Sequence, residues 1–467
     1  MKFVIQKISI FTTDGEKNVF SFSNTLTFIY GNFGTGKSTL LDLIVYSLGG
    51  NLTYTPAINN CFEAVQLEVK LNNKPFRFFR RVKSNRIQVD DMEKNQRYSL
   101  TNFQISSFIY KQYALPELYL SMGNIEDRKV KLTFANFLWF SYLKQSEMDN
   151  CFFYLNSDNI FKQNAAINVL LSFFESEFIL NKEVNQRYRD LKRRLRQYED
   201  SDKVFEYLEK IFIRNNEVEN TNMEVTISEL KKQIASALNN IENFNRDSIS
   251  RLLDMQKKLD ELEYRVAFEL RRARYYMEIE KLRKEMEGKS RHIYYDKSMM
   301  NSNVQLLYNL FLDCLVNIGF QGVSKFDTMR IDPITYMPIL TNTYENREVS
   351  FDNIGSGGKK TLFKICFALA IHRLQHAKQE DNYLPSFLII DTPMKNISER
   401  EDACMYDKFY HYLFTLLSTE LSDTQLIVVD KECKDLSKYK FTEEVVLMRM
   451  THEDGMNPPL FKNYKGL

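Results

Sequence analysis

The stretch Gly31–Ser38 reads GNFGTGKS and fits the pattern G-x-x-x-x-G-K-S of a phosphate-binding loop. The apolar run Leu26–Tyr30 precedes it, and the amphipathic stretch Ser38–Leu48 follows it, so the loop falls between a predicted buried strand and a predicted helix. In that setting the glycines allow successive backbone N–H groups to face a phosphate, and the start of the helix adds positive potential. The sequence therefore predicts a nucleotide-binding site near its N-terminus.

The residues of this loop have distinct expected roles in holding a nucleotide. Lys37 supplies a positive charge for the β- and γ-phosphates, and Ser38 supplies a hydroxyl for Mg²⁺. The predicted cofactors are accordingly ATP and Mg²⁺. The predicted nucleotide-binding residues are Asn32, Gly34, Thr35, Gly36, Lys37, Ser38 and Thr39.

Two further elements of a nucleotide site lie far along the chain. The apolar run Phe387–Ile390 predicts a buried strand, and Asp391 at its end is placed to reach a metal held by Ser38. The stretch Gly355–Lys360 precedes a predicted helix, Thr361–Leu374, and offers a second anion cradle. An ordinary glycine-rich loop is the alternative interpretation of that stretch. Its predicted binding residues are Ser356, Gly357, Gly358 and Lys359.

A site divided between the two ends of the chain closes only if those ends fold together, so the middle must leave the globular body and return. Residues 161–300 are charged and rich in helix formers, with neither proline nor glycine before Gly288. Their polar stretch 215–226 is the predicted hairpin tip. Apolar residues recur at three- and four-residue steps, as in a heptad seam, at Ile227, Leu230, Ile234, Ala237 and Ile241 and then at Leu252, Met255, Leu259, Leu262 and Val266.

These patterns predict an α/β fold in which an N-terminal lobe, residues 1–160, and a C-terminal lobe, residues 301–467, form one head. Residues 161–300 form an inserted antiparallel coiled-coil hairpin, and a helical domain packed against the body is the alternative. Within the first lobe, the apolar run Phe137–Leu143 predicts a further strand that ends at Lys144 and Gln145.

Composition narrows the class of protein. The chain has 467 residues, 44% of them hydrophobic, and a formal net charge of +2, which excludes a disordered polycation. It has no apolar run of about 18 residues that would predict a membrane span. We therefore expect a cytoplasmic protein without a membrane partner. Six scattered cysteines without a Cys-x-x-Cys pair argue against a zinc site and against a disulfide framework.

The order of these motifs resembles the ABC-type ATPase heads of the SMC and RecF group, which includes the zinc-hook DNA-repair ATPases. The resemblance rests on the phosphate loop, Gln145 at a strand end, the helical excursion, Ser356–Gly358 and Asp391. It covers both lobes, and the segment Ile390–Glu399 is similar to that group's strand and following loop. The helical excursion matches only in kind, because no Cys-x-x-Cys lies at the predicted tip.

The resemblance implies a homodimer whose two heads enclose two ATP molecules. Each head would bind ATP on its own Gly31–Ser38 loop, and Ser356–Gly358 of the second head would cap the γ-phosphate. By the same resemblance, Gln145 contacts Mg²⁺ and the attacking water. The implied metal-binding residues are Ser38, Gln145 and Asp391.

Three positions depart from this family. The family usually has a glutamate after the strand aspartate as general base, whereas this chain has Thr392, whose hydroxyl accepts no proton usefully at neutral pH. Ser398 stands at an aspartate position, and Asp430 or Lys431 stands where a switch histidine is expected. We expect an ATPase that is slow, or activated by a partner or DNA. The candidate catalytic residues are Gln145, Asp391, Glu399 and Asp430.

Basic residues in the helical stretch are candidates for DNA binding. A solvated coiled-coil face is the alternative, because acidic residues such as Glu199 and Glu278 lie nearby. On the head, Arg80 and Arg81 are further candidates. The predicted DNA contacts in the helical stretch are Arg193, Arg194, Arg271 and Arg272.

The leading functional hypothesis is a small bacterial SMC-like ATPase that dimerises on ATP and couples closure to DNA sensing or processing with a separately encoded effector or nuclease, in anti-phage defence or DNA repair. The alternative is a slowly hydrolysing regulatory or scaffolding switch that controls a protein partner without binding DNA. A transporter subunit is disfavoured, because such subunits lack a long helical excursion between Gln145 and Ser356.

Overall fold

The computed structural model describes residues 1–121, 129–174, 194–195, 197–201, 203, 223–239, 246–295, 302–332, 335–343, 347–378, 383–394, 403–452 and 459–461. The chain divides into two compact units. The first, which we call the head, combines Met1–Leu180 with Met300–Leu467. The second, the helical unit, is Asn181–Met299. The helix expected to open the insertion, α5 (Ile160–Ser172), therefore falls within the head.

A five-stranded parallel sheet lies at the centre of the head and takes strands from both ends of the chain. Every residue of β14 and β15 is buried, as expected for parallel strands covered on both faces. The N-terminal strand β3 pairs with β15 on one side and with β16 on the other. The strand order is β10 (Tyr142–Leu143), β14 (Phe387–Asp391), β15 (Gln425–Val429), β3 (Leu26–Gly31) and β16 (Val446–Met450).

A six-stranded antiparallel sheet forms from the N-terminal part of the head. Its tight turn between β4 and β5 consists of Asn72 and Asn73, both with positive φ, which suits a two-residue hairpin because asparagine tolerates this conformation. The strand order is β2 (Lys17–Ser21), β1 (Phe3–Thr12), β4 (Phe62–Leu71), β5 (Lys74–Arg81), β6 (Arg86–Asp91) and β7 (Gln96–Thr101).

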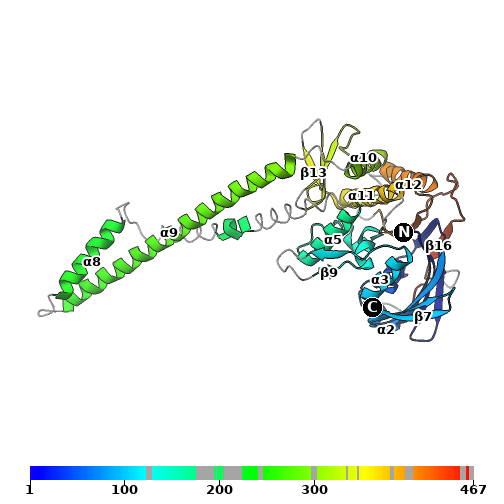
Figure 1. Cartoon of the computed structure of the whole chain (residues 1–467), viewed down its shortest axis with the longest axis horizontal. Helices are drawn as coiled ribbons and strands as arrows, with labels where there is room; N and C mark the ends of the chain where they lie inside the picture. The colour runs from blue at the N-terminus through cyan, green and yellow to red at the C-terminus, as the bar shows by residue number, and fades with distance from the viewer. Residues whose placement is uncertain are drawn as a thin grey trace. The chain divides into compact units, whose positions relative to one another are not determined.

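Helices cover these sheets (Figure 1). The longest in the head, α11, has an unbroken buried run from Thr361 to Gln375, so it is a central helix packed on every side. Small two- and three-stranded sheets complete the head: β8 (Tyr119–Ser121) with β9 (Lys129–Lys131), and β11 (Thr328–Ile331) with β12 (Pro338–Thr341) and β13 (Glu348–Ser350). Besides α5, the head helices are α1 (Lys37–Ser47), α2 (Pro56–Cys61), α3 (Asn102–Gln112), α4 (Phe134–Phe137), α10 (Ser302–Asn317), α11 (Gly357–Lys378) and α12 (Ala403–Ser418).

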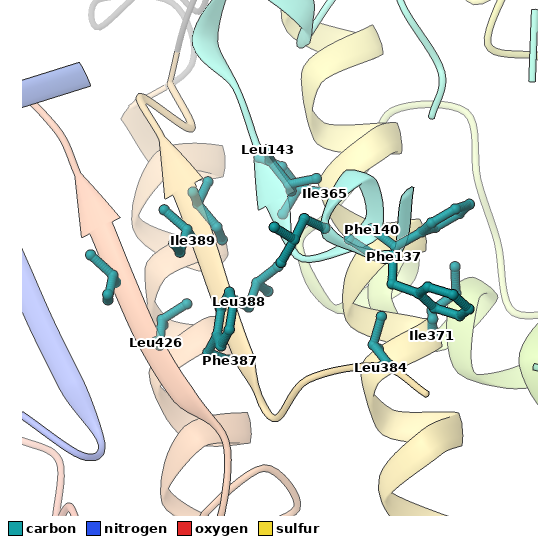
Figure 2. Packing of buried hydrophobic residues seen from close by; sticks show 14 of the residues in the cluster. Phe137, Phe140, Leu143, Ile365, Ile371, Leu384, Phe387, Leu388, Ile389 and Leu426 are labelled. Atoms are coloured by element: carbon teal, nitrogen blue, oxygen red, sulfur yellow. The ribbon is translucent and has the colours of Figure 1, made fainter. Parts of the chain in front are cut away.

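The strand predicted over Phe137–Leu143 is mostly wrong. This run closes α4, forms a 3-10 turn over Leu138–Phe140 and gives only β10 as strand. Thr133 and Asn136 form a capping box that starts the helical turn, and a fully buried aromatic run carries no periodicity that separates helix from strand. In Figure 2, side chains of this segment lie together with those of β14, β15 and α11 in one hydrophobic cluster.

A buried amide joins the two sheets. Gln425 is fully buried in β15, and its side-chain Nε2 donates to the backbone oxygens of Ile5 and Ser23, both at 2.7 Å. Its Oε1 accepts from the Ile5 backbone N–H at 2.8 Å. All three bonds are made to the N-terminal part of the chain, so one C-terminal side chain fixes β1 against the parallel sheet.

The helical unit contains α8 (Met223–Asn239) and α9 (Arg246–Tyr295), which pack against each other. Leu230, Leu259 and Leu262 form a buried cluster where the two helices meet, so this part of the predicted heptad seam is confirmed. A 50-residue α9 is about 75 Å long at 1.5 Å per residue. Partly buried apolar residues extend the seam, namely Met223, Ile227, Ile234 and Met255.

The structure describes only part of the predicted tip at 215–226. Residues 223–226 belong to α8, and residues 215–222 lie outside the described part of the chain. The residues of α8 that meet α9 include residues of the predicted seam. Among the described helices, none is long and apolar enough to cross a bilayer.

The Gln425 contacts make a testable contribution to stability. Replacing Gln425 with leucine removes the partner of three buried backbone groups, each worth about 1–3 kcal/mol, so we expect Gln425→Leu to lower the free energy of unfolding of the head by at least about 3 kcal/mol. Urea unfolding followed by tryptophan fluorescence measures this. Gln96 is exposed on β7, and Gln96→Leu should change the value by less than about 0.5 kcal/mol. Equal effects of the two substitutions would contradict the assigned role of Gln425.

Candidate nucleotide site

The phosphate loop connects β3 to α1 and contains three glycines with positive φ, of which Gly31 and Gly36 also lie against neighbouring residues. Gly31 has φ 124°, and a Cβ there would lie 2.1 Å from the backbone oxygen of Met450. Gly36 has φ 91° and is the residue before the first turn of α1. Because L-residues rarely adopt this backbone conformation, the loop requires glycine at both positions. The other predicted binding residues lie around Gly31 and Gly36 in the chain, namely Asn32, Gly34, Thr35, Lys37, Ser38 and Thr39.

Lys37 lies folded back on its own loop. Its Nζ donates to the backbone oxygens of Gly31 at 2.7 Å and Asn32 at 2.6 Å. Burial lowers the pKa of Lys37, and the carboxylates of Asp391 and Asp430 oppose that effect. The structure therefore brings one cation from the N-terminal part of the chain together with two carboxylates from the C-terminal part.

Asp391 ends β14 and is completely buried. Burial is the largest influence on its carboxyl group and raises its pKa, and Asp42 acts in the same direction. The Ser38 side chain, the Thr392 hydroxyl and the Gln145 backbone oppose it by interacting with the charged form. Residues from separate parts of the sequence thus meet at one carboxylate. Among them are Ser38, Gln145 and Asp391, the three residues predicted from the sequence to bind the metal.

The register of β10 explains how Gln145 reaches this point. Leu143 pairs with Ile390 in the parallel sheet, so the chain leaving β10 passes the end of β14. Asp42 on α1 fixes this exit, because it accepts hydrogen bonds from Tyr142 Oη and from Lys144 Nζ, both at 2.9 Å. Asp42 was not predicted as a site residue, and a single aspartate inside a predicted helix carries no signal for this role.

A divalent cation suits the groups at this position. Thr392 Oγ1 donates to Asp391 Oδ1 at 3.1 Å, whereas Asp391 Oδ2 is buried with no hydrogen-bond partner of good geometry among the described residues. A buried carboxylate oxygen left unpaired is costly unless a ligand completes it. Carboxylate and hydroxyl oxygens are the ligands that Mg²⁺ prefers, so Asp391 and Ser38 fit the predicted metal, with Gln145 beside them.

Comparison with known families agrees with this geometry. A family model described as an AAA domain (AAA_23) matches residues 2–242, more than half of the chain. The chain belongs to this AAA-domain family. The predictions of a P-loop ATPase and of an α/β head with a coiled-coil insertion are therefore confirmed at that level.

Solved structures similar to this AAA-domain chain include two Smc head domains. One, from Pyrococcus furiosus, has an extended coiled coil and is bound to the C-terminal domain of ScpA; it is 13% identical, with a TM-score of 0.43, over 92% of this chain and 90% of that chain. The other, from Pyrococcus yayanosii, has a coiled coil and joint; it is 16% identical, with a TM-score of 0.38, over 92% of each chain. No curated protein matches the chain.

The second glycine-rich stretch of this AAA-domain chain lies at the start of α11. That helix begins at Gly357, four residues before the predicted start at Thr361. Ser356 is exposed and caps the helix, with its Oγ accepting from the Lys359 backbone N–H at 3.4 Å. The serine was read as part of a loop because two glycines follow it. An exposed helix start is the arrangement that an anion approaching from outside the head requires.

The candidate bases differ in availability. The Asp430 carboxylate already accepts hydrogen bonds from Tyr410 Oη at 2.5 Å and from the Lys431 backbone N–H at 2.8 Å. Thr392 donates its hydroxyl to Asp391, as expected for a residue that is not a base. Glu399 and Ser398 lie outside the described residues.

One residue near the loop was missed from the sequence. His452 follows β16, and its Nε2 lies 2.8 Å from the backbone oxygen of Phe33 in the phosphate loop. The resemblance predicts a switch histidine after β15, where Asp430 stands, whereas His452 follows β16. Because β16 is the other neighbour of β3, its end also lies at the loop.

The predicted DNA-binding residues of the helical unit have local partners. Arg194 lies 4.0 Å from Glu278. Arg272 donates to Tyr276 Oη at 3.1 Å, and Arg271 is exposed. Arg193 lies outside the described residues.

Of the two head candidates for DNA binding, Arg80 is excluded by its position. It is 5% exposed and stacks on the ring of Tyr46. It also donates to the backbone oxygens of Tyr46 and Gly50 at the end of α1. Its role is therefore structural. Arg81 is exposed.

The raised pKa of Asp391 predicts how stability depends on pH. Because the folded state holds this proton more tightly than the unfolded chain, where the pKa is about 3.9, wild-type protein loses stability as pH rises through the unfolded and then the folded value. Asp391→Asn removes that loss. We therefore expect the metal-free variant to exceed wild type in free energy of unfolding at pH 7, with the difference shrinking toward pH 3.5.

Urea titrations of wild type and Asp391→Asn at both pH values check this. Asp254→Asn, on the exposed face of α9, is the matched control, and its free energy of unfolding should differ from that of wild type by the same amount at both pH values. Mg²⁺ with ATP should raise the melting temperature of wild type more than that of Asp391→Asn. A variant less stable than wild type at pH 7 and equally stabilised by Mg²⁺ with ATP would contradict the assigned role.

Proposed function

We propose that the chain is an SMC-like ATPase that binds ATP with Mg²⁺ and dimerises through its heads around two nucleotides. This proposal rests on one observation: Ser38 and Gln145 both interact with the buried carboxylate of Asp391. No single stretch of sequence supplies these groups. Strands from both ends of the chain bring these groups together. A metal-bound nucleoside triphosphate is a ligand that uses all of these groups.

Phosphate binding follows from the loop and its lysine. The backbone amides of the loop and the N-terminus of α1 face an anion, and Lys37 exchanges its bonds to Gly31 and Asn32 for bonds to the phosphates. Ser38 and Asp391 would hold Mg²⁺, which would neutralise part of the phosphate charge. Gln145 is placed by β10 to orient a water molecule beside them.

Hydrolysis in this proposal is slow. Thr392 occupies the position of the expected base, and Asp430 is held by Tyr410 and Lys431. These two hydrogen bonds occupy carboxylate oxygens that a general base needs for accepting a proton from water. This observation also supports the second candidate function, an ATP-dependent switch that closes on a protein partner and opens slowly, without binding DNA.

Dimerisation is assigned to the exposed start of α11. Ser356 is exposed at the surface of the head, where its side chain caps the start of α11, and in the proposed dimer Ser356 and the two following glycines contact the γ-phosphate held by the other head. We place this dimer in the cytoplasm, with a role in anti-phage defence or DNA repair. Its partner would be a separately encoded effector that recognises the closed dimer.

Ser356→Arg tests the dimer. We expect it to abolish ATP-dependent dimerisation, because a long cation replaces the small hydroxyl at the shared phosphate, and to leave ATP affinity of the monomer within about twofold, since each head binds on its own loop. Analytical ultracentrifugation with a non-hydrolysable ATP analogue measures the first, and fluorescent ATP titration of dilute protein measures the second. Lys37→Ala is the control that loses both. Equal loss of monomer binding in Ser356→Arg would remove the basis for the shared site.

DNA coupling is tested on the helical unit. If DNA lies along α9, the double variant Arg271→Glu, Arg272→Glu should weaken duplex binding and reduce the slope of log affinity against log salt by about 2. Fluorescence anisotropy at several salt concentrations measures this, together with the ATPase rate with and without duplex. Lys257→Glu with Lys258→Glu, also exposed on α9, is the matched control. Absence of any duplex effect on wild-type ATPase would favour the switch that controls a protein partner.

A further inference from the structure

A short C-terminal segment, Pro459–Phe461, packs directly on the phosphate loop. Leu460 is 1% exposed, and its backbone N–H donates to the Thr35 oxygen at 2.9 Å. A Cβ added at Gly36 would lie 2.5 Å from the Leu460 Cβ. Gly36 is therefore needed for two reasons, its backbone conformation and the closeness of Leu460, and the loop is supported from outside by a residue that no phosphate-loop motif contains.

The same segment is anchored to the antiparallel sheet. Asn18 on β2 donates from Nδ2 to the Leu460 backbone oxygen at 2.9 Å. Leu460 thus uses its N–H on the phosphate loop and its C=O on β2. A backbone held at both of its polar groups is fixed in position, so the side chain of the next residue, Phe461, is also directed.

Phe461 forms one wall of a pocket of about 230 Å³. The other walls come from the turn after β1, from Asn18 and from the end of α2, including Thr13, Asp14 and Asn60. Thr13 ties two of these walls together, because its Oγ1 donates to the Asn60 backbone oxygen at 2.9 Å. This volume is below the range of drug-sized sites, and an aromatic wall opposite polar groups suits a single heteroaromatic base.

We infer that Pro459–Phe461 completes the nucleotide site, with Leu460 bracing the phosphate loop and Phe461 packing against the base of the bound nucleoside triphosphate. This inference rests on the proposed function, because it takes the phosphates to lie in the Gly31–Ser38 loop. Asn18 lines the pocket and also anchors Leu460, whose backbone N–H bonds to the phosphate loop, so these contacts link the pocket to the loop. Asp14 and Asn60 supply hydrogen-bond acceptors for base or ribose donors.

The inference separates contacts to the base from contacts to the phosphates, and a ligand without a base tests that separation. Isothermal titration compares ATP with inorganic tripolyphosphate, both with Mg²⁺. We expect Phe461→Ala to weaken ATP binding roughly 5- to 100-fold, the range for losing one base–aromatic contact, and to leave tripolyphosphate binding unchanged. Unchanged tripolyphosphate binding also shows that the variant is folded. Phe461→Tyr, which keeps the ring, should retain ATP affinity.

Leu460→Ala is expected to weaken both ligands, because it loosens the loop that holds the phosphates. Phe326 is an exposed phenylalanine of the head, and Phe326→Ala is the matched control that changes neither affinity. If wild type binds ATP and Phe461→Ala binds it equally well, or loses ATP and tripolyphosphate to the same extent, the inference about Phe461 is wrong while the proposed function stands. If wild type binds neither ligand, the proposed function fails and the inference fails with it.

Discussion

The hydrogen bonding of β3 between β15 and β16 is the constraint on which the rest of the head depends. It places the phosphate loop at the ends of two strands from the opposite end of the chain. Because Asp391 ends β14 and Asp430 follows β15, their carboxylates arrive beside Lys37 without any local sequence relationship. Gln425 strengthens the same junction from within by bonding to Ile5 and Ser23.

The electrostatics at this junction are those of a site prepared for a ligand. Asp391 is buried with one oxygen unpaired, and Lys37 uses backbone oxygens of its own loop. Neither arrangement is the most stable one available to these side chains in isolation. Local departures of this kind are expected where function, and not folding, selects the residue.

Much of this could be predicted because the deciding motifs are local. The loop Gly31–Ser38 and the strand before Asp391 can each be recognised from about ten residues of sequence. Because both belong to one site, the two ends of the chain must meet. The aromatic run Phe137–Leu143 could not be assigned, since a buried run has no exposed face to set a period. Leu460 could not be found either, because its contact with Gly36 depends on long-range packing alone.

The helical unit shows a similar limit. The apolar spacing predicted which residues of α8 and α9 would meet, and Leu230 with Leu259 and Leu262 confirms it. The position of the turn was not encoded by the same pattern, because a heptad seam defines a face and not an end. The role proposed for Ser356 lies between two molecules, so the fold of one chain does not contain the contacts that this role requires.

The pairing of β3 has a consequence for how the protein is made. Ile5 and Gln425 are separated by 420 residues, and such long-range contacts form late because closing large loops is slow. On the ribosome, β1 and β4–β7 can pair soon after they emerge, whereas β3 waits with both edges unsatisfied until β15 and β16 have been synthesised. An exposed strand edge is a site for aggregation, so the nascent chain depends on protection of this one strand for nearly the whole of its synthesis.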